Sequence, residues 1–443
     1  MRNLFQYQPF VWVLLHLVLG IFIGWPFVAS ILSIGIVFFG VVIIITRKNE
    51  YQEAVLFSAY LIGSEVLFRM TGGAVLHELT KYAVMLFLFT GLVVERKKHQ
   101  INPLFIIYLL LLLIGISFTD VPFPESIRKA IAFNLSGPFL LGIAAMYFYN
   151  RKVSLNQLLR ILFYVALPII TMVSYLYFKT PSIQDIVFGT DASFEASGGF
   201  GPNQVSTILG IGIFILAIHI LMKKEFSGSI LLDYLLFIYI FYRTLLTFSR
   251  GGFYTIIIAF GSFFFFFFLY QKQQKSQLIR FAVLGLVLLI SISIYTSERT
   301  GGMLNNRYLN QNVQGETKKD ISTGRLWLFT QELETFYEHP FFGVGVGSSK
   351  FYRKEVSDKE AASHSEISRL LSEHGVIGLL ILVLLILIPI SKMKHQSYLA
   401  RAFLSAFMLI WFLTINHSAM RIALPAFFYG LSVIQFVKKE EEL

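Results

Sequence analysis

Long runs of apolar residues, separated by short polar segments, make up most of the chain. A transmembrane helix needs about 20 mostly apolar residues to cross roughly 30 Å of hydrocarbon. This criterion predicts fourteen helices, over residues 9–25, 27–46, 52–69, 73–94, 103–119, 131–149, 158–178, 203–222, 229–248, 252–270, 279–296, 375–391, 398–416 and 422–437. Because the third and fourth carry several charges, we expect an all-α polytopic membrane protein with about 12–14 transmembrane helices.

Two longer polar segments, 179–202 and 297–374, interrupt this pattern. Connections of such length are usually functional or disordered. The second contains aromatic and apolar residues at helical spacing, namely Trp327, Phe329, Leu333, Phe336 and Tyr337, so we expect it to be partly helical. The sequence therefore predicts four parts: N-terminal helices with an outer loop (1–200), central helices (201–296), a large loop (297–374) and C-terminal helices (375–443).

Composition excludes the soluble classes. Of the 443 residues, 56% are hydrophobic and only 14% are charged, against about 25% charged in a typical soluble domain. The chain has no cysteine, which excludes disulfides, thiolate catalysis and cysteine metal sites. Apolar sequence follows Arg2 and resumes after Trp25-Pro26, a pattern that predicts an uncleaved signal anchor followed by a second span.

The net charge of +11 comes largely from short basic clusters between apolar runs. With the N-terminus inside, every second connection carries one, at 47–48, 96–98, 151–152, 223–224, 272–280, 392–401 and 438–439. Short cytoplasmic loops are enriched in Lys and Arg, so these connections are predicted to be cytoplasmic. Segments 179–202 and 297–374 then lie outside, and the charge gives no support for nucleic acid as a partner.

A Ser-Arg-Gly-Gly sequence ends the ninth predicted span at residues 249–252. Arginine offers a rigid fork of donors that suits phosphate oxygens and stays charged when partly desolvated. Arg243 lies two helical turns before Arg250, at a depth where an arginine requires a partner or a water-filled cavity. Arg250 is therefore a candidate catalytic residue, and Arg243 and Ser249 are candidates for substrate binding. The alternative is that Arg250 anchors the helix at the membrane interface.

The large loop contains Ser322-Thr323-Gly324-Arg325, where Ser322 or Thr323 is predicted to cap a helix that Pro340 ends. Glycines at 343, 345 and 347 follow. Alternating glycines let backbone N–H groups approach an anion, but this run lacks the surroundings of a nucleotide fingerprint. We expect it to shape a loop near a substrate.

The loop closes on Ser363-His364-Ser365-Glu366, on a predicted helix that leads into the twelfth span. A histidine there is a candidate general base, although a surface helix with ordinary charge pairs is an alternative reading. On that helix, Glu366 shares one side with Arg369 and Glu373. A metal site from His364, Glu366 and His374 lacks convincing ligand spacing, so no metal and no cofactor is predicted.

Pro202-Asn203-Gln204 starts the eighth span and offers neutral hydrogen-bonding groups, Asn203 and Gln204, on the outer side.

Together and in this order, these segments resemble the O-antigen ligase and Wzy-type polysaccharide polymerase superfamily of membrane glycosyltransferases. The matching parts are Gly-Pro-Asn-Gln at 201–204, Ser-Arg-Gly at 249–251, Gly-Arg-Leu-x-x-Phe at 324–329, His-Pro-x-x-Gly-x-Gly at 339–345 and His-Ser-Glu with the following Leu-Leu-x-Glu-x-Gly-x-x-Gly at 364–378. The resemblance covers roughly residues 200–390. Many members have His-Asn where this chain has His-Ser-Glu.

The resemblance implies a GT-C-like fold and metal-independent, inverting transfer at the periplasmic face of the bacterial inner membrane. The donor is expected to be an undecaprenyl-diphosphate-linked glycan and the acceptor a sugar hydroxyl, on lipid A–core in a ligase. It further implies that Arg250 and Arg325 hold the diphosphate and that His364 assists the acceptor. Glu366, two residues after His364, is predicted to bind substrate. The motifs equally allow a polymerase, whose acceptor is another lipid-linked repeat. A lipid-linked glycan transporter is a further alternative, although the polar residues gather outside rather than at the bilayer midplane.

Overall fold

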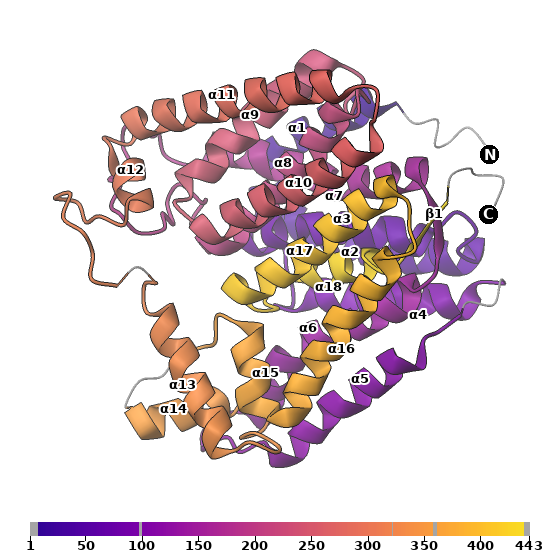
Figure 1. The fold of residues 1–443 in the computed structure, drawn as a ribbon, viewed down its shortest axis with the longest axis vertical. Coiled ribbons are helices and arrows are strands. Elements are labelled where there is room, and N and C mark those ends of the chain that lie inside the picture. The colour runs from indigo at the N-terminus through magenta and orange to yellow at the C-terminus, as the bar shows by residue number, and fades with distance from the viewer. Residues whose placement is uncertain (1–7, 97–99, 321, 358–360, 438–443) are drawn as a thin grey trace. The chain divides into compact units, whose positions relative to one another are not determined.

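The computed structural model describes residues 8–96, 100–320, 322–357 and 361–437, so the basic residues at 97–98 and 438–439 lie outside the described residues. The described part is nearly all helical (Figure 1). Its helices are α1 Pro9–Phe22, α2 Pro26–Arg47, α3 Glu53–Met70, α4 Leu79–Val94, α5 Pro103–Ile114, η1 Gly115–Phe118, α6 Ile127–Phe148, α7 Leu155–Lys179, α8 Pro202–Leu221, α9 Ile230–Leu246, α10 Arg250–Tyr270, α11 Lys275–Arg299, α12 Met303–Tyr308, α13 Arg325–Glu338, α14 Ser349–Ser357, α15 Glu366–His374, α16 Val376–Met393, α17 Tyr398–Ser418 and α18 Leu424–Leu431. Two strands, β1 Lys152–Ser154 and β2 Gln435–Val437, form a parallel pair with Val153 opposite Phe436.

Each of the fourteen predicted spans contains a helix, which confirms the all-α polytopic class. Among the described residues, eight helices are long and apolar enough to cross a membrane: α2, α6, α7, α8, α10, α11, α16 and α17. Three further apolar segments are shorter, at Pro9–Phe22, Leu79–Val94 and Pro103–Phe118.

The last predicted span, 422–437, differs from the expectation. It contains only the eight residues of α18 before the chain continues into β2. A helix rises 1.5 Å per residue, so α18 is about 12 Å long and does not cross the hydrocarbon by itself. Val437 is instead held beside Ser154 by the strand pair.

The chain forms two compact units. Unit 1 comprises Met1–Gly40, Val55–His77 and Asn156–Lys318, and unit 2 comprises Val41–Ala54, Glu78–Leu155 and Lys319–Leu443. The polar segment 297–374 therefore contributes to both units.

In unit 1, helix α8 packs against α9 and α10 and is buried along almost its whole length. A helix that is apolar on every side is suited to such a central position. Gly252 permits the close approach of α10, because a Cβ there would lie 2.5 Å from Ser206 Oγ and 2.6 Å from Thr207 N. This contact brings the Ser-Arg-Gly segment beside the start of α8.

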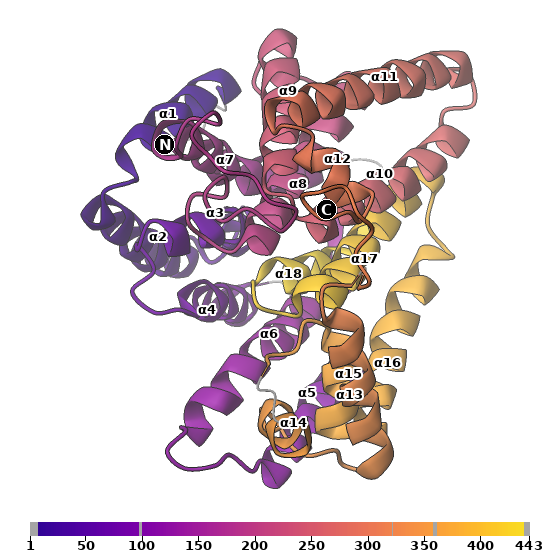
Figure 2. The same ribbon diagram turned by 90° about the vertical axis from the view of Figure 1, so that its left-hand side faces the viewer.

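In unit 2, α6 packs against α4, α5 and α18. Helix α15 contacts α13, α14, α16 and α17, and Figures 1 and 2 show these elements together beside α16. Short α15 is thus surrounded by helices, which explains why its polar residues are buried.

The glycine run at 343–347 fixes the C-terminal end of α15. Val344 N donates to Ser372 O at 2.9 Å, Gly345 N to Glu373 O at 3.1 Å and Val346 N to Gly115 O at 3.1 Å. Gly345 has φ of +87°, and a Cβ there would lie 2.2 Å from Phe118 O. Because carbonyl groups accept these N–H groups, the run joins α15 to η1 by close backbone packing, and the three amides do not face an anion.

Candidate active site

Arg325 and His364 line the same cleft of unit 2, with a volume of about 230 Å³. We call it the His364 cleft; its lining is Ser322, Arg325, Leu326, Leu328, Phe329, Glu332, His364, Ser365, Ser368 and Asn416. Arg325 is the first residue of α13, and Ser322 Oγ accepts from Leu326 N at 3.1 Å, as expected of a capping residue. Two side chains that lie 39 residues apart in sequence are thus brought to one cavity.

His364 lies just before α15, which begins at Glu366. The prediction that His364 is part of this helix is therefore wrong: Ser365 has an extended backbone, and the helix starts after it. The His364 carbonyl accepts from Ala419 N at 3.0 Å, and its ring Nδ1 lies 3.0 Å from Ala362 O. Since a carbonyl only accepts, Nδ1 carries the proton and Nε2 presents a lone pair.

The surroundings of His364 favour its neutral form. Burial, followed by the positive charges of Arg421 and Arg325, lowers the pKa of His364 to about 4. The neutral imidazole that a general base requires is therefore almost fully populated at neutral pH. The low pKa also makes His364 a weaker base.

Glu332 of α13 lies buried beside His364 in the same cleft. Its carboxylate accepts from the hydroxyls of Ser363 and Ser368 and pairs with Arg353 at 2.9 Å. Arg353 also donates to Ala361 O at 2.6 Å. This network holds both ends of the segment that carries His364.

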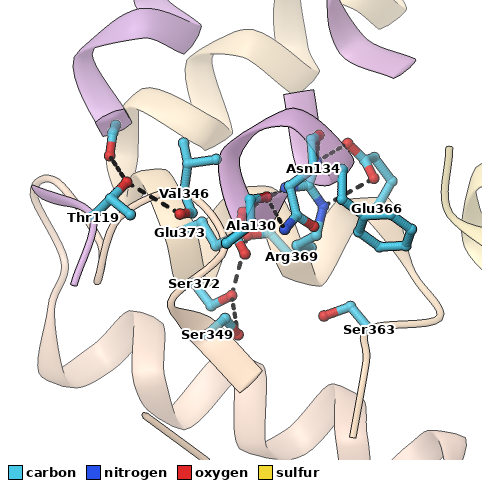
Figure 3. A network of polar contacts seen from close by, with 12 residues as sticks. Thr119, Ala130, Asn134, Val346, Ser349, Ser363, Glu366, Arg369, Ser372 and Glu373 are labelled. Carbon is cyan, nitrogen blue, oxygen red and sulfur yellow. Dashed lines mark hydrogen bonds and ion pairs between the residues drawn. The ribbon is translucent and has the colours of Figure 1, made fainter. Parts of the chain in front are cut away.

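Glu366 belongs to a different cleft. Arg369 of α15 lies between two carboxylates and donates to both, through Nε to Glu366 at 3.1 Å and through Nη1 to Glu373 (Figure 3). Arg369 Nη2 also donates to Asn134 O at 3.2 Å. The predicted placement of the three residues on one side of the helix is confirmed. Because Glu366 faces Arg369, its carboxylate is not directed at the His364 ring.

Unit 1 holds the other predicted residues. Ser249 directly precedes α10. Its Oγ donates to Asn203 Oδ1 at 2.8 Å, and its carbonyl accepts from Ser206 Oγ at 3.1 Å. Asn203 thereby fixes the turn from which Arg250 starts α10. Arg250 is half-buried. Burial raises the pKa of the nearby Tyr308 hydroxyl, and the positive charge of Arg250 partly offsets that rise.

Arg243 and Gln204 have partners within unit 1. Arg243 is buried and donates to Ala196 O at 2.9 Å and to Thr180 Oγ1 at 3.3 Å, so it holds the 179–202 loop on α9. Gln204 Oε1 accepts from Arg69 Nη1 at 3.4 Å. Arg69 in turn pairs with Glu65 at 2.7 Å, which explains how a charged pair is accommodated in α3.

Sequence reasoning missed three residues near these sites. Arg307 donates to Phe248 O at 3.1 Å and Thr190 O at 3.0 Å, beside the Arg250 turn. Arg421 donates to Ser363 O at 3.0 Å. A signal existed for Arg421, because it is a basic residue on a predicted outer connection, where the positive-inside rule does not favour one. Glu332 had a signal too, since Leu328, Glu332 and Thr335 form the buried face of α13.

Comparison with known families gives one match. Residues 235–383 match the family model described as O-Antigen ligase, over about a third of the chain. The matched range contains Arg243, Ser249, Arg250, Arg325 and the His364 cleft except Asn416, and it leaves out Asn203 and Gln204. No curated protein and no solved structure gave a match. The matched range supports a ligase- or polymerase-type function in general and a lipid-linked glycan as the class of substrate. Residues 235–383 of this multi-pass membrane protein are thus similar to the O-antigen ligase family.

Proposed function

We propose that the protein moves a glycan from an undecaprenyl-diphosphate carrier to an acceptor sugar hydroxyl, as an O-antigen ligase. The observation that carries the proposal is the His364 cleft, where a neutral imidazole and a guanidinium face one cavity within the family-matched segment. One group is suited to accept a proton and the other to stabilise an anion.

The reaction we propose is a single displacement. The acceptor oxygen attacks the anomeric carbon while the bond from that carbon to the diphosphate oxygen breaks. The acceptor proton passes to His364 Nε2, and the negative charge develops on the diphosphate. Arg325 stabilises that charge more in the transition state than in the ground state. One displacement inverts the anomeric centre. Because Arg325 supplies the positive charge, the proposed transfer needs no metal ion.

The unit 1 residues are proposed to bind the donor. Arg250 is assigned to the diphosphate, and Arg243 adds positive charge to the surrounding field. Ser249, Asn203 and Gln204 shape the start of α8 and α10 and offer neutral hydrogen bonds to the glycan.

The proposed location is the periplasmic face of the bacterial inner membrane. Segments 322–332 and 364–368, which line the His364 cleft, lie in the outer loop of the topology predicted from charge, and Asn416 is at the outer end of the predicted span 398–416. That the fold gathers segments from one predicted side supports this orientation.

The polymerase alternative uses the same donor and differs only in the acceptor. A deletion strain distinguishes the two, because loss of a ligase leaves the lipid core bare while loss of a polymerase leaves chains of a single repeat.

The first prediction concerns the arginines. Replacing Arg325 or Arg250 with alanine is expected to lower transfer from a lipid-linked glycan by about 10²–10³-fold, the usual effect of removing one donor to a developing anion. The measurement is formation of the new glycosidic bond in proteoliposomes with purified full-length protein. EDTA is expected to leave the wild-type rate unchanged.

Arg128→Ala is the matched control, because Arg128 is an exposed arginine that lines neither cleft. Wild-type rates in both folded arginine variants would refute the mechanism, as would EDTA inactivation reversed by a divalent ion. Movement of the glycan across the bilayer without bond formation would favour a transporter.

The second prediction concerns pH. Wild-type kcat/KM is expected to stay level on the acid side until about pH 4, because the pKa of His364 is lowered to about 4. Arg421→Gln removes a positive charge that disfavours imidazolium, so the acid limb should move upward, toward 6.5. Arg325 also lowers this pKa, while Glu332 lines the same cleft with the opposite charge. An unchanged acid limb in Arg421→Gln, with Arg128→Gln as control, would contradict the assignment.

A further inference from the structure

A second cleft of unit 2 lies on the other side of the His364 segment. It has a volume of about 400 Å³, within the range of about 300–1,000 Å³ that is usual for small-molecule sites. We call it the Glu366 cleft. Its lining includes Lys129, Phe133, Lys350, Glu366, Arg369 and Arg421, which come from α6, α14, α15 and the connection before α18.

The floor of this cleft is a built polar surface. Glu366 and Glu373 are each 2% exposed and Arg369 is 4% exposed, so the three charges are desolvated and fixed by their mutual hydrogen bonds. Carboxylates accept from hydroxyl groups, and a guanidinium donates to them in a rigid geometry. The cleft lining as a whole carries charges of both signs: Lys129, Lys350, Arg369 and Arg421 are basic, and Glu125, Glu366 and Glu373 are acidic.

The walls supply apolar contact. The ring of Phe133 lines the cleft and is 42% exposed, and the ring of Phe351 lines it while almost fully buried. Four small residues, Ala130, Gly347, Ala362 and Ala419, also line the cleft. An aromatic face combined with fixed hydrogen-bonding groups is suited to a ring that has both C–H faces and hydroxyl edges.

The two clefts share a thin wall. Ala362 and Ser363 line the Glu366 cleft, whereas the next two residues, His364 and Ser365, line the His364 cleft. A hydroxyl compound bound in the first cleft is therefore adjacent to the residue assigned as base in the second.

We propose that the Glu366 cleft binds the saccharide of the acceptor substrate, with Phe133 packing on a sugar ring and Glu366, Arg369 and Glu373 bonding its hydroxyls. This inference rests on the proposed transfer function. It assigns the acceptor, rather than the donor, because the cleft neighbours the segment that carries the base.

Direct binding is the first test. Two soluble probes are titrated into the purified full-length protein without donor: the core oligosaccharide of lipid A–core, and a single-repeat oligosaccharide. One of them is expected to bind, and Phe133→Ala should weaken that binding about tenfold, the effect of losing an aromatic contact of about 1.4 kcal/mol. Phe341→Ala is the matched control, because Phe341 is 73% exposed and lines neither cleft. Binding of neither probe to wild type, or equal weakening in the control, would overturn the proposal.

Kinetics identify the source of the saccharide. Ala362→Trp fills the cleft, and should raise KM for the acceptor about tenfold or more while leaving KM for the donor within about twofold. Ala132→Trp, at an exposed position of α6 outside the cleft, is its control. A rise in the donor KM alone would assign the cleft to the donor glycan and refute the acceptor assignment.

The two proposals fail differently. His364→Ala should bind the oligosaccharide as wild type does while losing transfer. If His364→Ala retains transfer, the mechanism fails but the saccharide site stands. If wild type transfers glycan and both Phe133→Ala and Ala362→Trp behave as wild type, the saccharide site fails but the mechanism stands.

Discussion

Replacing His364 with alanine is expected to lower the rate of glycan transfer by about 10²–10⁴-fold, the range for loss of a general base. The ring presents Nε2 to the His364 cleft because Nδ1 is engaged by Ala362 O, and its pKa, lowered to about 4, keeps it neutral. Without the imidazole, the acceptor hydroxyl has to lose its proton to water. The measurement is kcat at saturating donor and acceptor in proteoliposomes.

His395→Ala is the control, since His395 is an exposed histidine outside both clefts. Added imidazole should restore part of the rate of His364→Ala and should not affect the control. A His364→Ala protein that is folded and transfers glycan at the wild-type rate would remove the residue from the mechanism.

Replacing Arg369 with alanine is expected to destabilise unit 2 by about 3–5 kcal/mol, because it leaves two buried carboxylates without their partner. Burial by itself lowers the pKa of Arg369, but Glu366 and Glu373 outweigh that effect and raise it, so the side chain is charged. Burial also raises the pKa of Glu373 to about 7 even with the arginine present. The result should appear as a lower midpoint of thermal unfolding in detergent.

The charge argument can be separated from lost packing. Adding Glu366→Gln and Glu373→Gln to Arg369→Ala removes the unpaired charges and should recover part of the stability. Arg128→Ala, an exposed change, should stay within about 0.5 kcal/mol of wild type. A triple variant no more stable than Arg369→Ala would mean that desolvated charge is not the cause.

Hydropathy predicted the helices well, because a lipid-facing helix has to be continuously apolar and this requirement is local in sequence. All fourteen predicted segments contain a helix. The prediction differed at 422–437, where the residues are apolar because α18 packs against α6 and α17, and where the chain then pairs β2 with β1. Burial inside the protein and burial in lipid both favour apolar residues, so the sequence alone did not distinguish a buried helix from a membrane-spanning one.

The site was only partly predictable. Arg325 and His364 were identified by resemblance, and the structure places both in one cleft. The roles of Glu332 and Arg421 depend on contacts between distant segments, Glu332 with Ser363 and Arg421 with the Ser363 carbonyl. No local pattern encodes such contacts. Glu366 was placed near His364 by sequence distance, but the start of α15 turns the two side chains to different clefts.

The glycine run beside α15 has a consequence for how this protein can diversify. Backbone atoms lie within 2.5 Å of where a Cβ would stand at Gly343 and Gly345, and both have positive φ, so no other residue fits there without moving α15 or η1. By contrast, Lys129 and Phe133 are exposed at the rim of the neighbouring cleft. Selection for a new glycan can therefore act on Lys129 and Phe133 while the backbone around the glycine run stays fixed.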